Sequence, residues 1–318
     1  MPAQKENSHH SFRLNPLRQR SNVKRAAFSK LAPIIFVGPA ILFVVVFLYA
    51  PIIFSVALSF SSWNFISPEI NFVGFENYRR VFHDPNFQDA AYNTLLYCVV
   101  LIPVQIIVPL LLASLILRVK NRNLAGFYKA TLFLPTILAY STAGIAWLWL
   151  FDPINGFLNS VLTAFGLPQS RWQTDPNLAI WCVAFVTFWK NFGLNMLLLL
   201  AALVSIPKEI HEAAALDNAG PWRRLLTIDL PLISPTFFFV AVTTTINVMD
   251  DIVGVIDVLT SGGPYGQSSN ILYYMYERGL SFFQFGQASA ASVIIIILVL
   301  FVTWAQFRMF ENRVHYES

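Results

Sequence analysis

Residues 205–235 read SIPKEIHEAAALDNAGPWRRLLTIDLPLISP, a charged stretch set between two strongly apolar ones. Pro207 can occupy the first turn of a helix, where its missing N–H costs nothing. Asn218 and Gly220 supply turn chemistry because both residue types tolerate a positive φ at low cost, and Pro221 can open a second helix. The stretch therefore predicts a helix-turn-helix loop that leaves the membrane between two spans.

The composition around this loop is that of a membrane protein. The 318 residues are 56% hydrophobic and 12% charged, whereas soluble domains carry about 25% charged residues. Six apolar stretches are long enough to cross a hydrocarbon core, which needs about 20 helical residues. They lie near residues 34–59, 92–117, 130–151, 178–204, 235–259 and 286–307. We therefore expect an all-α membrane protein with six transmembrane helices.

The basic residues predict the orientation of these spans. Sixteen of the 21 Lys and Arg residues fall in the two tails, the connection at 118–129 and the loop at 205–234. By the positive-inside rule, both termini and the loop are cytoplasmic. We expect a basic cytoplasmic tail at 1–31, a membrane domain at 32–309 containing the loop at 205–234, and a cytoplasmic tail at 310–318.

Several classes of site are absent from the sequence. The chain has no G-x-x-x-x-G-K-[ST] motif, so it cannot hydrolyse ATP by the P-loop route. Its five His residues are scattered, and Cys98 and Cys182 lie in apolar spans, so no metal-ligand spacing or disulfide framework occurs. No basic-aromatic patch suggests nucleic acid. We therefore expect no cofactor, metal or catalytic residue in this chain, and no nucleic-acid partner.

Polar residues inside the spans are the candidates for transport chemistry, because a charge at mid-membrane costs about 2.5–3.5 kcal/mol on insertion scales. They recur every three or four residues, which places them on one face of a helix. The fourth span carries Thr187, Lys190, Asn191 and Asn195, and the fifth carries Thr243, Asn247, Asp250, Gly254 and Asp257, with Asp251 next to them. We expect both stripes to face one water-lined chamber.

The stripes leave two interpretations of the charges open. Lys190 could pair with Asp250 or Asp251 to fix helix packing, or these groups could contact a solute. A secondary transporter or channel would use the same residues for ion coupling without an ATPase partner. A membrane enzyme with Asp250 and Asp251 as acid and base is disfavoured, because adjacent helical residues point about 100° apart.

The loop resembles a known motif. The spacing E-A-A, then Asp, then I-x-L-P is similar to the EAA loop of permease subunits of ATP-binding-cassette importers. That resemblance implies that the loop contacts an ATP-hydrolysing subunit and that the glutamate of the motif pairs with a basic residue there. The family pattern has Gly where this chain has Asn218. The candidate coupling residues are Glu212, Ala213, Ala214, Asp217, Asn218, Gly220, Leu230 and Pro231.

Other segments resemble the carbohydrate-uptake branch of these importers, and most closely the first permease subunits of sn-glycerol-3-phosphate importers. They are WK-x(4)-N, VID-x(2)-TSGGP and the closing QFR-x(2)-E-x(2)-V-x-Y. The resemblance implies a solute surrounded by Lys190, Asn191, Leu194, Met249 and Asp251. To these the polar stripes add the candidates Asn195, Asn247 and Asp250.

The same resemblance implies the assembly and its mechanism. We expect a multi-pass subunit in a bacterial inner membrane, in contact with membrane lipid. Its partners are a second homologous permease, two ATP-binding subunits that hold ATP and Mg, and an extracytoplasmic solute-binding protein. Import proceeds by alternating access, and this chain forms half of the pathway. The sequence does not distinguish whether the solute is a neutral sugar, an oligosaccharide, glycerol phosphate or another anion.

Overall fold

The structure is a computed structural model that describes residues 36–66 and 68–310. The expected tails at 1–31 and 310–318 lie outside the described residues, apart from the helical backbone at residue 310. By internal contacts the chain divides into two units, residues 1–55 and 56–318. The helical stretch Phe36–Ser59, which includes the π-helical turn η1 (Val45–Tyr49) and α2 (Ala50–Ser59), is long and apolar enough to cross a membrane.

The second unit is almost entirely helical, as the sequence predicts. One small departure is a two-stranded antiparallel ladder of β1 (Ser61–Ser62) and β2 (Asn71–Phe72). The helices that lie in the predicted spans are α4 (Pro85–Ile116), α5 (Arg122–Ile137), α6 (Tyr140–Leu150), α8 (Ala179–Ser205), α12 (Ser234–Asp250), α13 (Ile252–Leu259) and α15 (Phe285–Phe310). The other helical segments are α3 (Glu76–His83), α7 (Phe157–Ala164), η2 (Trp172–Thr174), α9 (Lys208–Leu216), α10 (Pro221–Arg224), η3 (Leu225–Asp229), α11 (Leu230–Leu232), α14 (Ile271–Tyr276) and η4 (Glu277–Ser281).

Five described helical stretches have the length and composition of single spans: the one at Phe36–Ser59, α4, α8, α12 with α13, and α15. The stretch predicted as a span at 130–151 differs. There α5 and α6 meet at an angle of 101°, so the pair is either one broken span or a re-entrant loop. Pro135 removes one backbone hydrogen bond near the end of α5, and Leu138 and Ala139 then take extended conformations. The stretch is therefore not one continuous helix, and the count of six spans stays a prediction.

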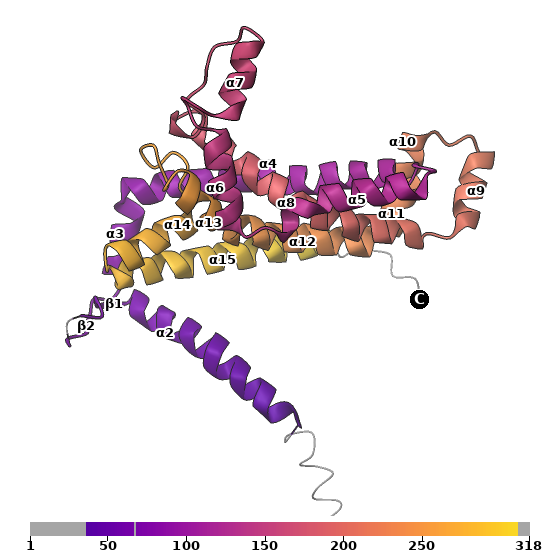
Figure 1. The fold of residues 1–318 in the computed structure, drawn as a ribbon. Helices are drawn as coiled ribbons and strands as arrows, with labels where there is room; N and C mark the ends of the chain where they lie inside the picture. Colours follow the sequence, from indigo (N-terminus) through magenta and orange to yellow (C-terminus); the bar gives the residue numbers. More distant parts are fainter. Residues whose placement is uncertain (1–35, 67, 311–318) are drawn as a thin grey trace, which may run out of the picture. The chain divides into compact units, whose positions relative to one another are not determined.

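The helices of the second unit form a bundle with two different ends. Within it α4 packs against α8 and α12, α5 packs against α8, and α6 packs against α13. Figure 1 shows α9 and α10 at one end of the bundle and α3 and α14 at the opposite end. The bundle therefore separates the loop at 205–234 from α3 and α14.

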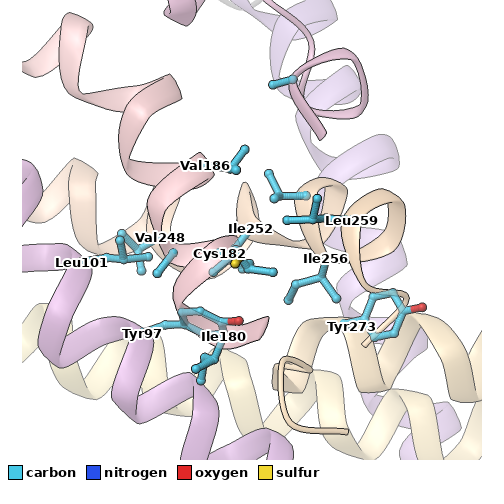
Figure 2. Close-up of a cluster of buried hydrophobic side chains, with 14 of the residues drawn as sticks. Tyr97, Leu101, Ile180, Cys182, Val186, Val248, Ile252, Ile256, Leu259 and Tyr273 are labelled. Carbon is cyan, nitrogen blue, oxygen red and sulfur yellow. The ribbon is translucent and has the colours of Figure 1, made fainter. Parts of the chain in front are cut away.

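The core of the bundle is formed where α4, α8, α12 and α13 converge. Figure 2 shows Tyr97 and Leu101 of α4, Val186 of α8 and Ile256 of α13 among the side chains that fill this region. Cys182 is buried in the same cluster and is a free thiol, as its apolar surroundings in the sequence suggest. Burial of these side chains provides the main apolar stabilisation of the helices that carry the polar stripes.

A glycine sets the distance between α8 and α5. A Cβ placed on Gly193 would lie 2.5 Å from the carbonyl oxygen of Leu132 and 2.9 Å from the Cα of Phe133. No larger residue fits at that distance, so Gly193 allows the two backbones to touch. The contact brings Lys190, one turn earlier on α8, next to the C-terminal end of α5.

A half-buried ion pair holds the end of the bundle formed by α3 and α14. Asp84 caps α4 by accepting from the backbone N–H of Asn86, and its carboxylate also accepts from the Tyr274 hydroxyl at 2.8 Å and from the Arg278 guanidinium. Burial, together with the hydrogen bond donated to Asp84, raises the pKa of Tyr274 above its usual value. The tyrosine therefore stays neutral and ties α14 to the start of α4.

Candidate solute pathway and coupling hairpin

The centre of the candidate pathway is the break between α5 and α6. The Nζ atom of Lys190 lies 3.7 Å from the centroid of the Tyr140 ring and 3.5 Å from the backbone carbonyl oxygen of Thr136. A cation is stabilised over an aromatic face and at the C-terminal end of a helix, and both partners act here on one buried ammonium. Lys190 thus joins α8 to both sides of the break.

A hydrogen-bonded chain continues from this point across the bundle. The Tyr140 hydroxyl donates to Oδ1 of Asn191 at 2.9 Å, and Nδ2 of Asn191 donates to Oδ2 of Asp251 at 3.4 Å. Asp251 is the residue between α12 and α13. The structure therefore brings together Lys190, Asn191 and Asp251, as the two polar stripes predict.

The other predicted pathway residues divide into two groups. Leu194, Asn247 and Asp250 are exposed on the surface of this chain. Leu194 lies on α8 with Lys190 and Asn191, and Asn247 and Asp250 lie on α12 just before Asp251. Met249 and Asn195 are buried instead. The side-chain amide of Asn195 donates to the backbone carbonyl oxygen of Gln105 at 2.8 Å and to the Thr244 hydroxyl at 2.9 Å. Both hydrogen bonds join α8 to neighbouring helices. In this conformation the structure leaves these two residues away from the exposed polar edge.

The sequence left two roles open for Lys190, Asp250 and Asp251: an ion pair that fixes helix packing, or contact with a solute. The geometry supports neither role in that form. Among the described residues, the salt bridges do not include one between Lys190 and Asp250 or Asp251. The partners of the lysine are the aromatic ring and the helix-end carbonyl. Asp250 is exposed at mid-span, and an exposed charge there must face water or another protein because lipid cannot solvate it.

The loop at 205–234 forms a hairpin of two helices, which we call the coupling hairpin (residues 205–234). Its first helix is α9, and the second arm is the continuous helical run of α10, η3 and α11. Asn218 in the turn has a φ of 50°, the left-handed conformation for which the family pattern uses Gly. Asparagine tolerates that region better than most residues, so the turn forms without the glycine.

A buried carboxylate ties the two arms of the hairpin. Oδ2 of Asp229 lies 3.4 Å from Nε of Arg224, and its Oδ1 lies 3.7 Å from Nδ1 of His211. Asp229 is 6% exposed, while the Arg224 and His211 side chains are half-buried. The contact with Arg224 lies within the second arm, and the contact with His211 joins the two arms. Sequence reasoning missed this residue, since an aspartate in a charged loop has no pattern that predicts burial.

The candidate coupling residues include both buried and exposed positions of the hairpin. Ala214 is buried and Leu230 is half-buried, while Glu212, Ala213, Asp217, Asn218, Gly220 and Pro231 are exposed. Three large apolar side chains are exposed beside them: Leu216, Trp222 and Leu226. Exposed apolar side chains outside the spans, with charged neighbours, are typical of surfaces that bind another protein.

Comparison with known proteins identifies the family. Residues 82–316 match the family described as "Binding-protein-dependent transport system inner membrane component". The chain belongs to this family. It is 32% identical over 289 residues to the sn-glycerol-3-phosphate transport system permease protein UgpA of Escherichia coli (strain UTI89 / UPEC), covering 91% of this chain and 97% of that protein. The values are the same for UgpA of Salmonella typhimurium (strain LT2).

Solved structures of the same kind share the fold. A chain in the crystal structure of a bacterial alginate ABC transporter, in complex with an alginate pentasaccharide-bound periplasmic protein, aligns with a TM-score of 0.79 and 23% identity. The alignment covers 95% of this chain and 100% of that chain. A second structure, of a bacterial ABC transporter involved in the import of the acidic polysaccharide alginate, aligns with the same TM-score at 24% identity.

Family membership confirms the resemblance inferred from the E-A-A spacing. The relatives are permease subunits of transport systems and not enzymes, so the interpretation of Asp250 and Asp251 as a catalytic pair is dropped. The sequence contained a weak signal for the residues that were missed at the helix break. Pro135 interrupts an apolar stretch, and Thr136, Tyr140, Ser141 and Thr142 follow it closely.

Proposed function

We propose that this chain is the transmembrane subunit of an ATP-driven importer and forms half of its translocation pathway. One observation carries the proposal: an ordered hairpin with exposed Glu212 and Trp222 lies at the opposite end of the bundle from the outer connections. A hairpin in that position can receive mechanical work on one side of a membrane and pass it to the spans.

The proposed assembly has four kinds of subunit. A second homologous permease covers the exposed polar edge at Asn247 and Asp250, which lipid cannot solvate. Two ATP-binding subunits, which carry ATP and Mg, contact the coupling hairpins. An extracytoplasmic solute-binding protein delivers the solute, in agreement with the family description and with the periplasmic protein named in the related structure.

The mechanism we propose is alternating access. Closure of the ATPase dimer pushes on α9 around Glu212, and the carboxylate of Asp229 makes the two arms of the hairpin move together. The second arm runs through α11 directly into α12, the helix that carries Asn247 and Asp250. The extended residues Leu138 and Ala139 can absorb the resulting rotation of α6 against α5, as hinge residues do.

The transported solute is a sugar, a polyol or a glycerol-phosphate-like molecule. The names of the relatives include sn-glycerol 3-phosphate and alginate, and both solutes bear several hydroxyl groups. Amide and carboxylate groups at Asn191, Asn247, Asp250 and Asp251 suit hydroxyl donors and acceptors. The ammonium of Lys190 is engaged by Tyr140 and Thr136, so in this conformation it does not balance an anionic solute.

The proposed location is a bacterial inner membrane with both termini in the cytoplasm. The family name specifies an inner membrane component, and the described residues include five helices of spanning length, or up to six if the bent pair is one span. The distribution of Lys and Arg supports the orientation, since the coupling hairpin and the connection before α5 carry most of the basic residues between spans.

Purification of the complex tests this function. The chain should co-purify with a subunit that carries a P-loop, and a solute-loaded binding protein should stimulate ATP hydrolysis in proteoliposomes. Glu212→Ala should abolish the stimulation of uptake while the complex still assembles. Solute movement by the purified chain in vesicles without any ATPase would instead establish a secondary transporter or channel and remove the proposal.

A further inference from the structure

A cavity lies where the second arm of the coupling hairpin meets the inner ends of two spans. Its volume is about 280 Å³. It is lined by Ser114, Leu117 and Arg118 after α4, Leu203 near the end of α8, and Ala219, Pro221, Arg224, Leu225 and Asp229 of the hairpin. Nothing in the proposed pathway or the predicted ATPase contact uses this cavity.

The cavity presents two guanidinium groups with unused hydrogen-bond donors. Among the described residues, the side chain of Arg118 has no hydrogen-bond or ion-pair partner, and it is exposed. Arg224 uses Nε for Asp229 at 3.4 Å, and no contact of its two terminal nitrogens is found within the described part of the chain. Two forked donors that share one opening are suited to the oxygens of a phosphate ester.

The other residues that line the cavity indicate a second property of a molecule that would bind there. Oδ1 of the buried Asp229 lies 3.7 Å from Nδ1 of His211, beyond hydrogen-bond distance, and has no hydrogen-bond donor among the described residues, although the residue lines the cavity. An occupant that carries a hydroxyl or amine beside its phosphate would supply that donor. The walls formed by Leu117, Leu203 and Leu225 are apolar and suit a glycerol or acyl segment.

The position of the cavity decides between possible sources of such a phosphate. The spans α4 and α8 end at Ile116 and Ser205, so Arg118 and Leu203 lie at the level where hydrocarbon gives way to headgroups. By the distribution of Lys and Arg this is the cytoplasmic leaflet, where anionic lipids attract basic side chains. A free phosphate would not use the apolar walls.

We propose that this cavity binds the headgroup of an anionic, hydroxyl-bearing phospholipid of the inner leaflet, with Arg118 and Arg224 on its phosphate. The lipid fills the space between the coupling hairpin and the inner ends of α4 and α8. It thereby stiffens the joint through which the second arm of the hairpin moves the spans. The site is separate from the solute pathway, so it stands or falls independently of the solute that is carried.

Lipid titration of the purified complex tests the site. Complexes in nanodiscs of phosphatidylcholine are titrated with phosphatidylglycerol, and bound lipid is counted by native mass spectrometry. Arg118→Gln should weaken retention of phosphatidylglycerol by about tenfold, the loss expected for one charge-assisted hydrogen bond. Lys120→Gln changes an exposed basic residue two positions away that does not line the cavity, and it should leave retention unchanged.

Three results would overturn the assignment. Equal phosphatidylglycerol retention by Arg118→Gln and Lys120→Gln would show that the cavity is not the site. Displacement of the lipid by inorganic phosphate at a comparable affinity would point to a free anion. If Arg118→Gln does not assemble, photoactivatable phosphatidylglycerol on the wild-type complex decides: labelling should map to residues 114–118 and 219–229, and labelling confined to other segments removes the proposal.

Discussion

The mid-bundle network and the coupling hairpin handle polar groups in opposite ways. At the helix break, Tyr140 holds the Lys190 ammonium over its ring and donates its hydroxyl to Asn191, and only an edge of polar side chains stays exposed. In the hairpin, one buried carboxylate ties the arms while Glu212 and Trp222 remain at the surface. The first arrangement joins helices within the chain, and the second holds a rigid surface ready for a partner.

The difference suggests how each region fails when it is changed. Disruption of the network formed by Lys190, Tyr140 and Asn191 should reduce the stability of the chain, because the lysine is buried and the contacts join α5, α6 and α8. Disruption of the hairpin surface should leave the fold intact and remove the transfer of work from the partner. The substitutions that follow separate these two kinds of failure.

The largest effect is expected at Glu212. Glu212→Ala removes the acidic partner of the proposed ATPase contact, and the loss of one member of such an interfacial pair costs about 2–5 kcal/mol. Uptake in proteoliposomes should fall by more than tenfold, while expression and thermal stability stay unchanged. Glu209→Ala, on the same helix and also exposed, is the matched control and should retain uptake. Equal losses in the two variants would contradict a specific role for Glu212.

Gly193→Ala should produce the other kind of failure. The added methyl group would overlap the Leu132 carbonyl oxygen, and overpacking of this kind costs about 1–3 kcal/mol of stability. The melting temperature of the detergent-solubilised complex should therefore fall. Gly126→Ala on α5 meets open space and should be neutral or mildly stabilising. A Gly193→Ala protein as stable as Gly126→Ala would show that α5 and α8 do not touch at this point.

Asp229→Asn tests the tie within the hairpin. The substitution removes the charge of the buried carboxylate that faces Arg224 and His211, at a cost of about 1–3 kcal/mol. The effect should be local: residues 208–232 should exchange amide hydrogens faster, while the core helices keep their protection. Asp217→Asn, in the exposed turn, should leave the exchange pattern unchanged. Uniform loosening of the whole chain by Asp229→Asn would mean that the hairpin is not an independent unit.

Lys190→Met should have the smallest effect of the four. It keeps most of the side-chain volume and removes the contact with the Tyr140 ring, which is worth about 0.5–2 kcal/mol. Stability should drop slightly, and the affinity for the imported solute should change little. Lys190→Arg, which preserves the cation over the ring, should restore the stability. A large loss of solute affinity in Lys190→Met would place the ammonium on the solute instead.

Much of this architecture could be predicted from the sequence, because a span is defined by its length and apolar composition. The predicted ends agree within a few residues for α8, α12 with α13, and α15, although α4 begins at Pro85 rather than near residue 92. The turn at Asn218 was also predictable, since few residue types adopt a positive φ. These features depend on local chemistry alone.

The contacts of Tyr140 at the helix break and the burial of Asp229 and Met249 could not be predicted. Each depends on which helix lies opposite: Tyr140 gains its role from Lys190 and Asn191, and Asp229 from Arg224 and His211. A stripe of polar residues every three or four positions shows that one face is polar. It does not show which members of the stripe hydrogen-bond to neighbouring helices inside the protein, as Asn195 does.

Site-specific photo-crosslinking from position 222 tests the central claim most directly. Trp222 is exposed at the start of the second arm, where an ATPase subunit should cover it. A photoreactive residue there should crosslink to a P-loop subunit in the assembled complex, and the yield should change when ATP is bound. Crosslinks to the solute-binding protein, or labelling of this position by reagents confined to the outer side of the membrane, would contradict the account.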